Sequence, residues 1–141
     1  MQNTTLFWLN RTFDETLNLL EEAKYYNEHL IKRQVRHLMP IARLEVTAES
    51  LRVTSRLSHT MAWLITEKAI LNDELDRMEA ESLYRPLFEE STCLNLMQCT
   101  DDICPNGLLS LLDRSRDLFI RACRLENMLR AETTEPILVL T

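Results

Sequence analysis

The sequence contains very little glycine: Gly107 is the only one among 141 residues. Loops that cradle a phosphate need several glycines, because backbone N–H groups must approach the anion closely. The sequence therefore excludes a P-loop and a glycine-rich dinucleotide-binding turn. The scarcity of glycine also argues against a β fold with many tight turns.

The sequence also lacks a long apolar run and an excess of basic residues. No apolar stretch approaches the roughly 18 residues that a membrane-spanning helix needs, and the first residues do not resemble a signal peptide. The net charge is −6, from 22 acidic and 16 basic residues, which argues against general nucleic-acid binding. We therefore expect a cytoplasmic protein with no membrane span, no nucleic-acid partner, and four reduced cysteines.

Histidine is scarce as well, and we find no catalytic or metal-binding motif. The histidines are His29, His37 and His59. None has a local motif that pairs it with a cysteine or serine nucleophile, and none completes the Glu-x-x-His pattern of di-iron bundles. The cysteines between residues 93 and 104 are spaced more widely than the paired cysteines of structural zinc sites. The sequence predicts no enzymatic activity, no cofactor and no metal.

What the sequence does contain is helical periodicity. Apolar residues recur at steps of three and four in three segments, which predicts three long helices. These helices are expected at Thr12–Leu38, Ile41–Asp73 and Pro105–Arg130. The first opens where Thr12 and Glu15 have the spacing of a capping box, and Pro40 must end it.

The helix lengths and the short first connection predict an all-α fold, an antiparallel three-helix bundle with a long loop between the second and third helices. We expect one domain over residues 1–141. Its other parts would be an N-terminal arm at 1–11, a long connection at 76–106 and a short C-terminal tail at 131–141. A short helical piece is expected near Glu79–Tyr84 within the long connection.

The middle helix carries an unusual set of side chains on one side. On a helical net, Arg52, Arg56, His59 and Trp63 lie together, beside or opposite the apolar stripes. A solvated face with weak ion pairs would explain the charged residues, but not an indole among them. Tryptophan and arginine are also the residues that most often anchor interfaces. We predict that these four residues bind a partner protein, while Trp63 folded over the edge of the core stays open as an alternative.

The same stretch carries a resemblance to a known family. The segment LRVTSRLSHTMAWLITEKAI, Leu51 to Ile70, combines an arginine-hydroxyl-arginine-leucine run with a following tryptophan-leucine pair. It resembles the central helix of the RcdA family, the regulators of CtrA degradation in alphaproteobacteria. The segments LNLLEEAKYY and LLDRSRDLFIRACRLENML are similar to the first and last helices of that family. The resemblance therefore reaches all three predicted helices.

The resemblance implies a non-enzymatic, homodimeric three-helix protein that acts as an adaptor in regulated proteolysis and the cell cycle. Its partners would be a ClpX-type unfoldase of the ClpXP protease together with a CpdR-like response regulator. Its cargo would be protein substrates, or a further adaptor that responds to cyclic-di-GMP. The sequence departs from the family at residues 72–75, where the family tends to have a glycine-containing turn, and in its cysteine-bearing connection.

Two other interpretations stay open at the level of sequence. One is a histidine phosphotransfer bundle that uses His59, although the basic residue and glycine usual after such a histidine are replaced by Ala62 and Trp63. The other is a purely structural bundle whose apolar stripes mediate self-assembly.

Overall fold

The computed structural model describes residues 2–84, 86, 87, 99 and 102–140, with side chains given for those between 3 and 131. All regular secondary structure in these ranges is helical, so the all-α prediction is confirmed. The elements are α1 (Gln2–Tyr25), η1 (Tyr26–Leu30), α2 (Ile31–Gln34), α3 (Pro40–Leu71), α4 (Arg77–Leu83) and α5 (Asn106–Leu140). None of the helices in the described ranges is long and apolar enough to cross a membrane.

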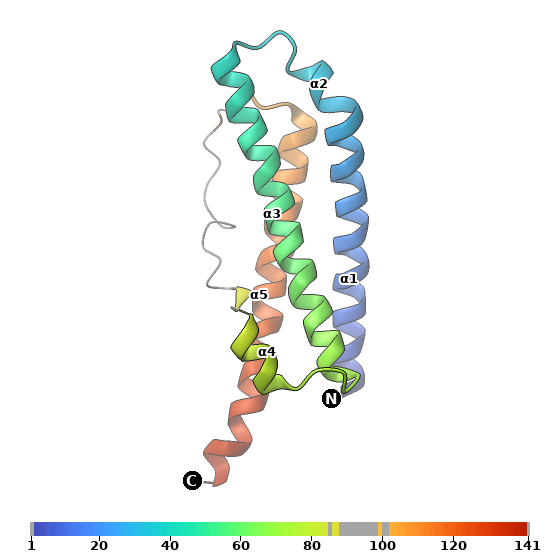
Figure 1. Cartoon of the computed structure of the whole chain (residues 1–141), viewed down its shortest axis with the longest axis vertical. Coiled ribbons are helices and arrows are strands. Elements are labelled where there is room, and N and C mark those ends of the chain that lie inside the picture. The colour runs from blue at the N-terminus through green and yellow to red at the C-terminus, as the bar shows by residue number, and fades with distance from the viewer. Residues whose placement is uncertain (1, 85, 88–98, 100–101, 141) are drawn as a thin grey trace.

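The three long helices, α1, α3 and α5, lie side by side (Figure 1). A π-helical turn, η1, and the short α2 extend α1 toward the end of the molecule where α3 begins. Pro40 occupies the first turn of α3, where its missing N–H has no intrahelical partner to lose. The short α4 lies at the opposite end, beside the last turns of α3 (Figure 1).

The direction of α5 corrects the antiparallel arrangement predicted from the sequence. Helix α1 runs opposite to the other two, but α3 and α5 run in the same direction (Figure 1). The contacts agree with this direction. Arg56 contacts Leu112 near the start of α5, and Glu67, which is further along α3, lines the same pocket as Leu129, which is further along α5. The prediction assumed that each connection reverses the chain. The 34 residues between Leu71 and Asn106 are long enough to return along the whole bundle.

The predicted N-terminal arm at 1–11 is also wrong, because α1 already begins at Gln2. Thr12 is not a helix cap: its carbonyl accepts a hydrogen bond of 2.7 Å from the Thr16 hydroxyl inside α1. Leu9 is completely buried, so this segment contributes to the core. The capping-box pattern spans only four residues, and tertiary burial of the preceding apolar residues outweighs it.

The other boundaries agree better with the sequence. Helix α3 matches the predicted Ile41–Asp73 to within two residues at either end, and α4 falls at the expected short helical piece. Helix α5 begins as predicted but continues to Leu140, so the predicted C-terminal tail at 131–141 is largely helical backbone. Much of the predicted connection at 76–106 lies outside the described residues.

The core is built mainly from apolar side chains of α1, α3 and α5. Its fully buried members include Val46, Leu57 and Leu108. The single glycine has a place here, because a Cβ atom on Gly107 would lie 2.7 Å from Cε2 of the Tyr26 ring. That ring is buried, and burial raises the pKa of Tyr26 to about 12. Gly107 therefore lets α5 begin directly against η1.

Candidate protein-docking face

Arg56, the central residue of the predicted partner-binding set, is buried and not on the surface. Only 2% of it is exposed. Its guanidinium donates a hydrogen bond of 3.0 Å to the Leu112 carbonyl and one of 3.4 Å to the Ser115 hydroxyl, both on α5. The helical net placed Arg56 outside because it assumed that apolar stripes alone face the neighbours. Arg56 instead joins α3 to α5 from within.

Arg52 lies one turn earlier and is mostly covered. Its Nε atom is 3.2 Å from an Oε of Glu49, whose side chain is only 1% exposed. The pair therefore has one buried member, and it is more than the weak surface ion pair expected from the sequence. The role of Arg52 in partner binding stays a prediction.

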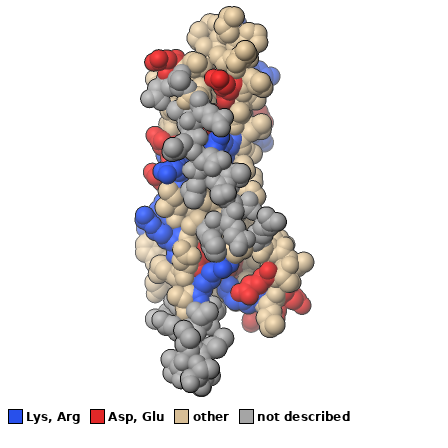
Figure 2. Space-filling model, turned by 90° about the vertical axis from the view of Figure 1, so that its left-hand side faces the viewer, with Lys and Arg blue, Asp and Glu red and all other residues tan. Residues whose placement is uncertain are grey.

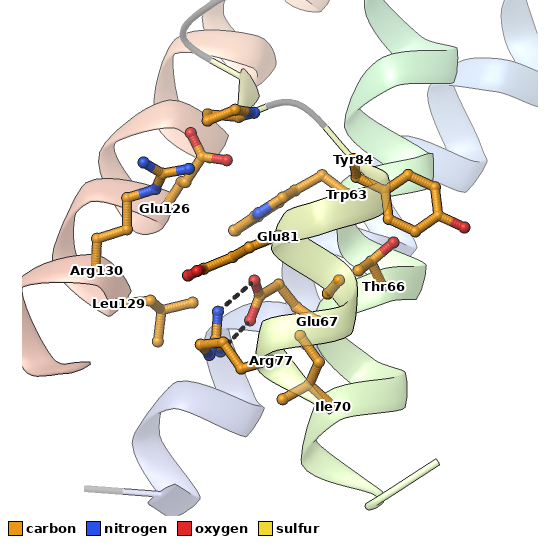
Figure 3. Close-up of a pocket in the computed structure, with 12 residues that line it drawn as sticks. Trp63, Thr66, Glu67, Ile70, Arg77, Glu81, Tyr84, Glu126, Leu129 and Arg130 are labelled. Carbon is orange, nitrogen blue, oxygen red and sulfur yellow. Dashed lines mark hydrogen bonds and ion pairs between the residues drawn. The ribbon is translucent and has the colours of Figure 1, made fainter. Parts of the chain in front are cut away.

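Trp63 is half-buried and packs against a second, smaller core cluster. That cluster contains Leu87, Phe119 and Ala122. Figure 3 shows the indole extending from α3 toward α5. The alternative that Trp63 folds over the edge of the core therefore describes part of its side chain, while the remainder stays accessible.

His59 and Trp63 meet in a groove between α3 and α4, which we call the α3–α4 groove. Its volume is about 180 Å³. It is lined by His59, Ala62, Trp63, Thr66, Leu83, Tyr84 and Leu87. Leu83 and Tyr84 are 69% and 54% exposed, so the groove presents aliphatic and aromatic surface to solvent. Such surface is typical of protein-interaction sites.

An ion pair fixes α4 against α3 and so shapes this groove. The Arg77 guanidinium makes two hydrogen bonds to the Glu67 carboxylate, at 3.2 and 2.9 Å, and Figure 3 shows both. Glu67 is buried, and its hydrogen bonds raise the pKa of Arg77 above its ordinary value. Two parallel hydrogen bonds also fix the orientation of the partners, so α4 is held in one position.

A buried carboxylate of α5 holds the chain just beyond α4. Glu126 is 4% exposed and accepts a hydrogen bond of 2.9 Å from the backbone N–H of Leu87. The pocket in Figure 3, between Trp63, the Glu67–Arg77 pair and Glu126, has a volume of only about 40 Å³. That space fits a few water molecules but not a metabolite.

Sequence reasoning missed the contribution of α4 to this face. Leu83 and Tyr84 lie some twenty residues after Trp63, in the short helical piece that the sequence predicts within the long connection. The segment RMEAESLY mixes apolar and charged side chains, and this local pattern does not say where the segment docks.

The part of the chain that the structure describes contains no cluster of three or more histidine, cysteine, aspartate or glutamate side chains suited to a metal ion. Cys93 lies outside that part. On the face shown in Figure 2, basic and acidic side chains alternate along the bundle instead of forming one continuous basic patch. The α3–α4 groove, with its exposed aliphatic and aromatic side chains, is therefore kept as the candidate site.

Comparison with known proteins identifies the family. The model of a family described as "Protein of unknown function (DUF1465)" matches residues 2–137. The crystal structure of RcdA from Caulobacter crescentus CB15 superimposes with a TM-score of 0.64, at 28% sequence identity, over 85% of this chain and 88% of that one. A search of curated proteins gave no match. The chain therefore belongs to the DUF1465 family, and its resemblance to RcdA, first seen in the central helix, is confirmed.

Proposed function

We propose that this protein is a non-enzymatic adaptor that tethers protein substrates, or a further adaptor, to a ClpXP-type protease. The unfoldase of that protease would be primed by a CpdR-like response regulator. The likeness to RcdA across most of the chain supports this role. The observation that carries it for this molecule is the α3–α4 groove, in which Trp63 of the family-like motif on α3 lies beside the exposed Tyr84 at the end of α4.

An adaptor acts by binding two proteins at once and needs no acid, base or metal of its own. It raises the local concentration of cargo at the protease, so that weak contacts become sufficient. A rigid scaffold with exposed anchor residues suits that task, because little conformational freedom is lost on binding. The three long helices would provide the scaffold, and we propose that the protein works as a cytoplasmic homodimer.

Within this proposal the four predicted residues have different roles. Trp63 and His59 would contact the partner directly, because both line the α3–α4 groove. Arg52 would contribute at the edge of the same helix. Arg56 would act from inside, by holding α3 in register with α5. Tyr84, which the sequence did not single out, would be a further contact residue.

Replacing Tyr84 or Trp63 with alanine is expected to weaken binding to the unfoldase and response-regulator pair by roughly tenfold or more, as for central aromatic anchors of an interface. The measurement is biolayer interferometry with the immobilised protein. Tyr84→Ala is the cleaner variant, because Tyr84 is more than half exposed and its removal leaves no cavity in the core.

Met78→Ala is the matched control, because Met78 is 78% exposed on α4 but does not line the groove. Circular dichroism must show native helix content for all three variants. Affinities equal to that of the unchanged protein for both Tyr84→Ala and Trp63→Ala would rule out the groove as the docking face.

The structure gives less support to phosphotransfer through His59. A histidine that exchanges a phosphoryl group with a response regulator must face an open helix surface. His59 is half-buried and faces the groove beside Trp63 and Leu83. The groove around His59 therefore suits a partner protein that inserts side chains into it better than it suits phosphoryl transfer.

A further inference from the structure

A second groove lies on another face of the molecule, between the first half of α1 and the second half of α5. We call it the α1–α5 groove. Its volume is about 320 Å³. The residues that matter for its chemistry are Trp8, Arg11, Arg121, Arg124, Leu125 and Met128. None of them lines the α3–α4 groove, so the two surfaces are distinct.

The α1–α5 groove has an unusually accessible apolar surface. Trp8 is 44% exposed and Met128 is 61% exposed, with the partly buried Leu125 between the helices. Phe7 packs edge-on against Trp8 at 5.5 Å between ring centroids and is itself exposed. Aromatic and methionine side chains are the residues that interfaces favour, and methionine adapts its shape to different partners.

Arginine side chains surround this apolar surface. Arg11 and Arg121 both pair with Glu15, at 3.4 and 2.7 Å, so one carboxylate is shared between two guanidinium groups. Arg124 is exposed, and no ion pair joins it to another residue in the described ranges. Three cations against one anion give the groove a positive charge in a chain whose net charge is −6.

We propose that the α1–α5 groove binds an acidic peptide segment of a partner protein, one in which carboxylates flank a large apolar side chain. The apolar side chain would rest on Trp8 and Met128. The carboxylates would pair with Arg124 and with the partly neutralised Arg11 and Arg121, because guanidinium groups bind carboxylates through two parallel hydrogen bonds. The proposal does not depend on the protease role, since the binding it describes is independent of any unfoldase.

Fluorescence anisotropy with a fluorescein-labelled peptide of glutamates around leucine and phenylalanine tests this proposal. A second peptide, with lysine in place of every glutamate, is the probe control. The glutamate peptide should bind with an affinity that falls as salt is added. The lysine peptide should not bind. Arg124→Glu should reduce affinity for the glutamate peptide at least tenfold, and Trp8→Ala should also reduce it.

Arg116→Glu is the matched control variant. Arg116 is an exposed arginine of the same helix that does not line the groove, so the change in net charge is identical. Equal losses for Arg124→Glu and Arg116→Glu, or no binding of the glutamate peptide, would overturn the proposal. It would also be overturned if groove variants abolished self-association in sedimentation without affecting the peptide, because a second copy would then occupy the groove. Binding to the unfoldase should persist in Arg124→Glu, which separates this test from that of the α3–α4 groove.

Discussion

Replacing Arg56 with glutamate is expected to lower the free energy of unfolding by about 3–5 kcal/mol, the usual cost of breaking a buried charged contact. The native guanidinium donates hydrogen bonds to the Leu112 carbonyl and the Ser115 hydroxyl. A glutamate cannot donate to either and would place a carboxylate beside a carbonyl oxygen in the core. Urea denaturation followed by circular dichroism would measure the loss.

The control for this prediction is again Arg116→Glu, because it makes the same chemical change at an exposed position of α5. Surface substitutions of this kind usually stay within about 0.5 kcal/mol. A midpoint for Arg56→Glu equal to that of the control would show that Arg56 does not join α3 to α5. Any loss of partner binding in Arg56→Glu must therefore be corrected for the fraction of unfolded protein.

Replacing Phe119 with alanine is expected to cost a similar 3–5 kcal/mol. Phe119 is completely buried on α5 and forms the smaller core cluster with Leu87 and Ala122. Trp63 packs against that cluster, so the cavity left by the ring should also loosen the indole. Urea denaturation measures the stability, and tryptophan fluorescence in a Trp8→Phe background reports on Trp63 alone.

Leu51→Ala is the comparison for Phe119→Ala, because Leu51 lies on α3 with 64% of its surface exposed. It should change neither the stability nor the emission of Trp63 appreciably. If Phe119→Ala left the fluorescence of Trp63 unchanged in folded protein, the indole would be independent of the core. The smaller core cluster would then not hold Trp63 in its place in the α3–α4 groove.

The helices that were predicted well are those with strong local signals. Pro40 begins α3 and the apolar steps after Pro105 locate the start of α5, because proline and periodicity act through neighbouring residues. The residues between Leu51 and Ile70 also carried the family resemblance, which the comparison with RcdA confirms. The helical class and the central motif were therefore accessible from the sequence.

The features that were missed depend on contacts between distant parts of the chain. Helix α3 lies between α1 and α5, so polar residues such as Glu49, Arg56 and Thr60 are buried with apolar ones. A helical net ranks faces by hydrophobicity and cannot recognise a buried arginine whose partner is a carbonyl 56 residues away. The parallel direction of α5 depends on the long connection that precedes it. The docking of α4 depends on the contact of Arg77 with Glu67 and on the hydrogen bond between Leu87 and Glu126.

The central claim is that this protein joins two other proteins, and a reconstituted degradation assay tests it most directly. Increasing amounts of the protein would be added to a ClpXP-type protease, its response-regulator partner and a purified substrate that co-purifies with the protein from its own cell extract. An adaptor predicts that the degradation rate rises and then falls at excess, when substrate and protease bind different copies. Tyr84→Ala should shift the rise to higher concentration. A degradation rate that stays at its starting value at every concentration would contradict the account.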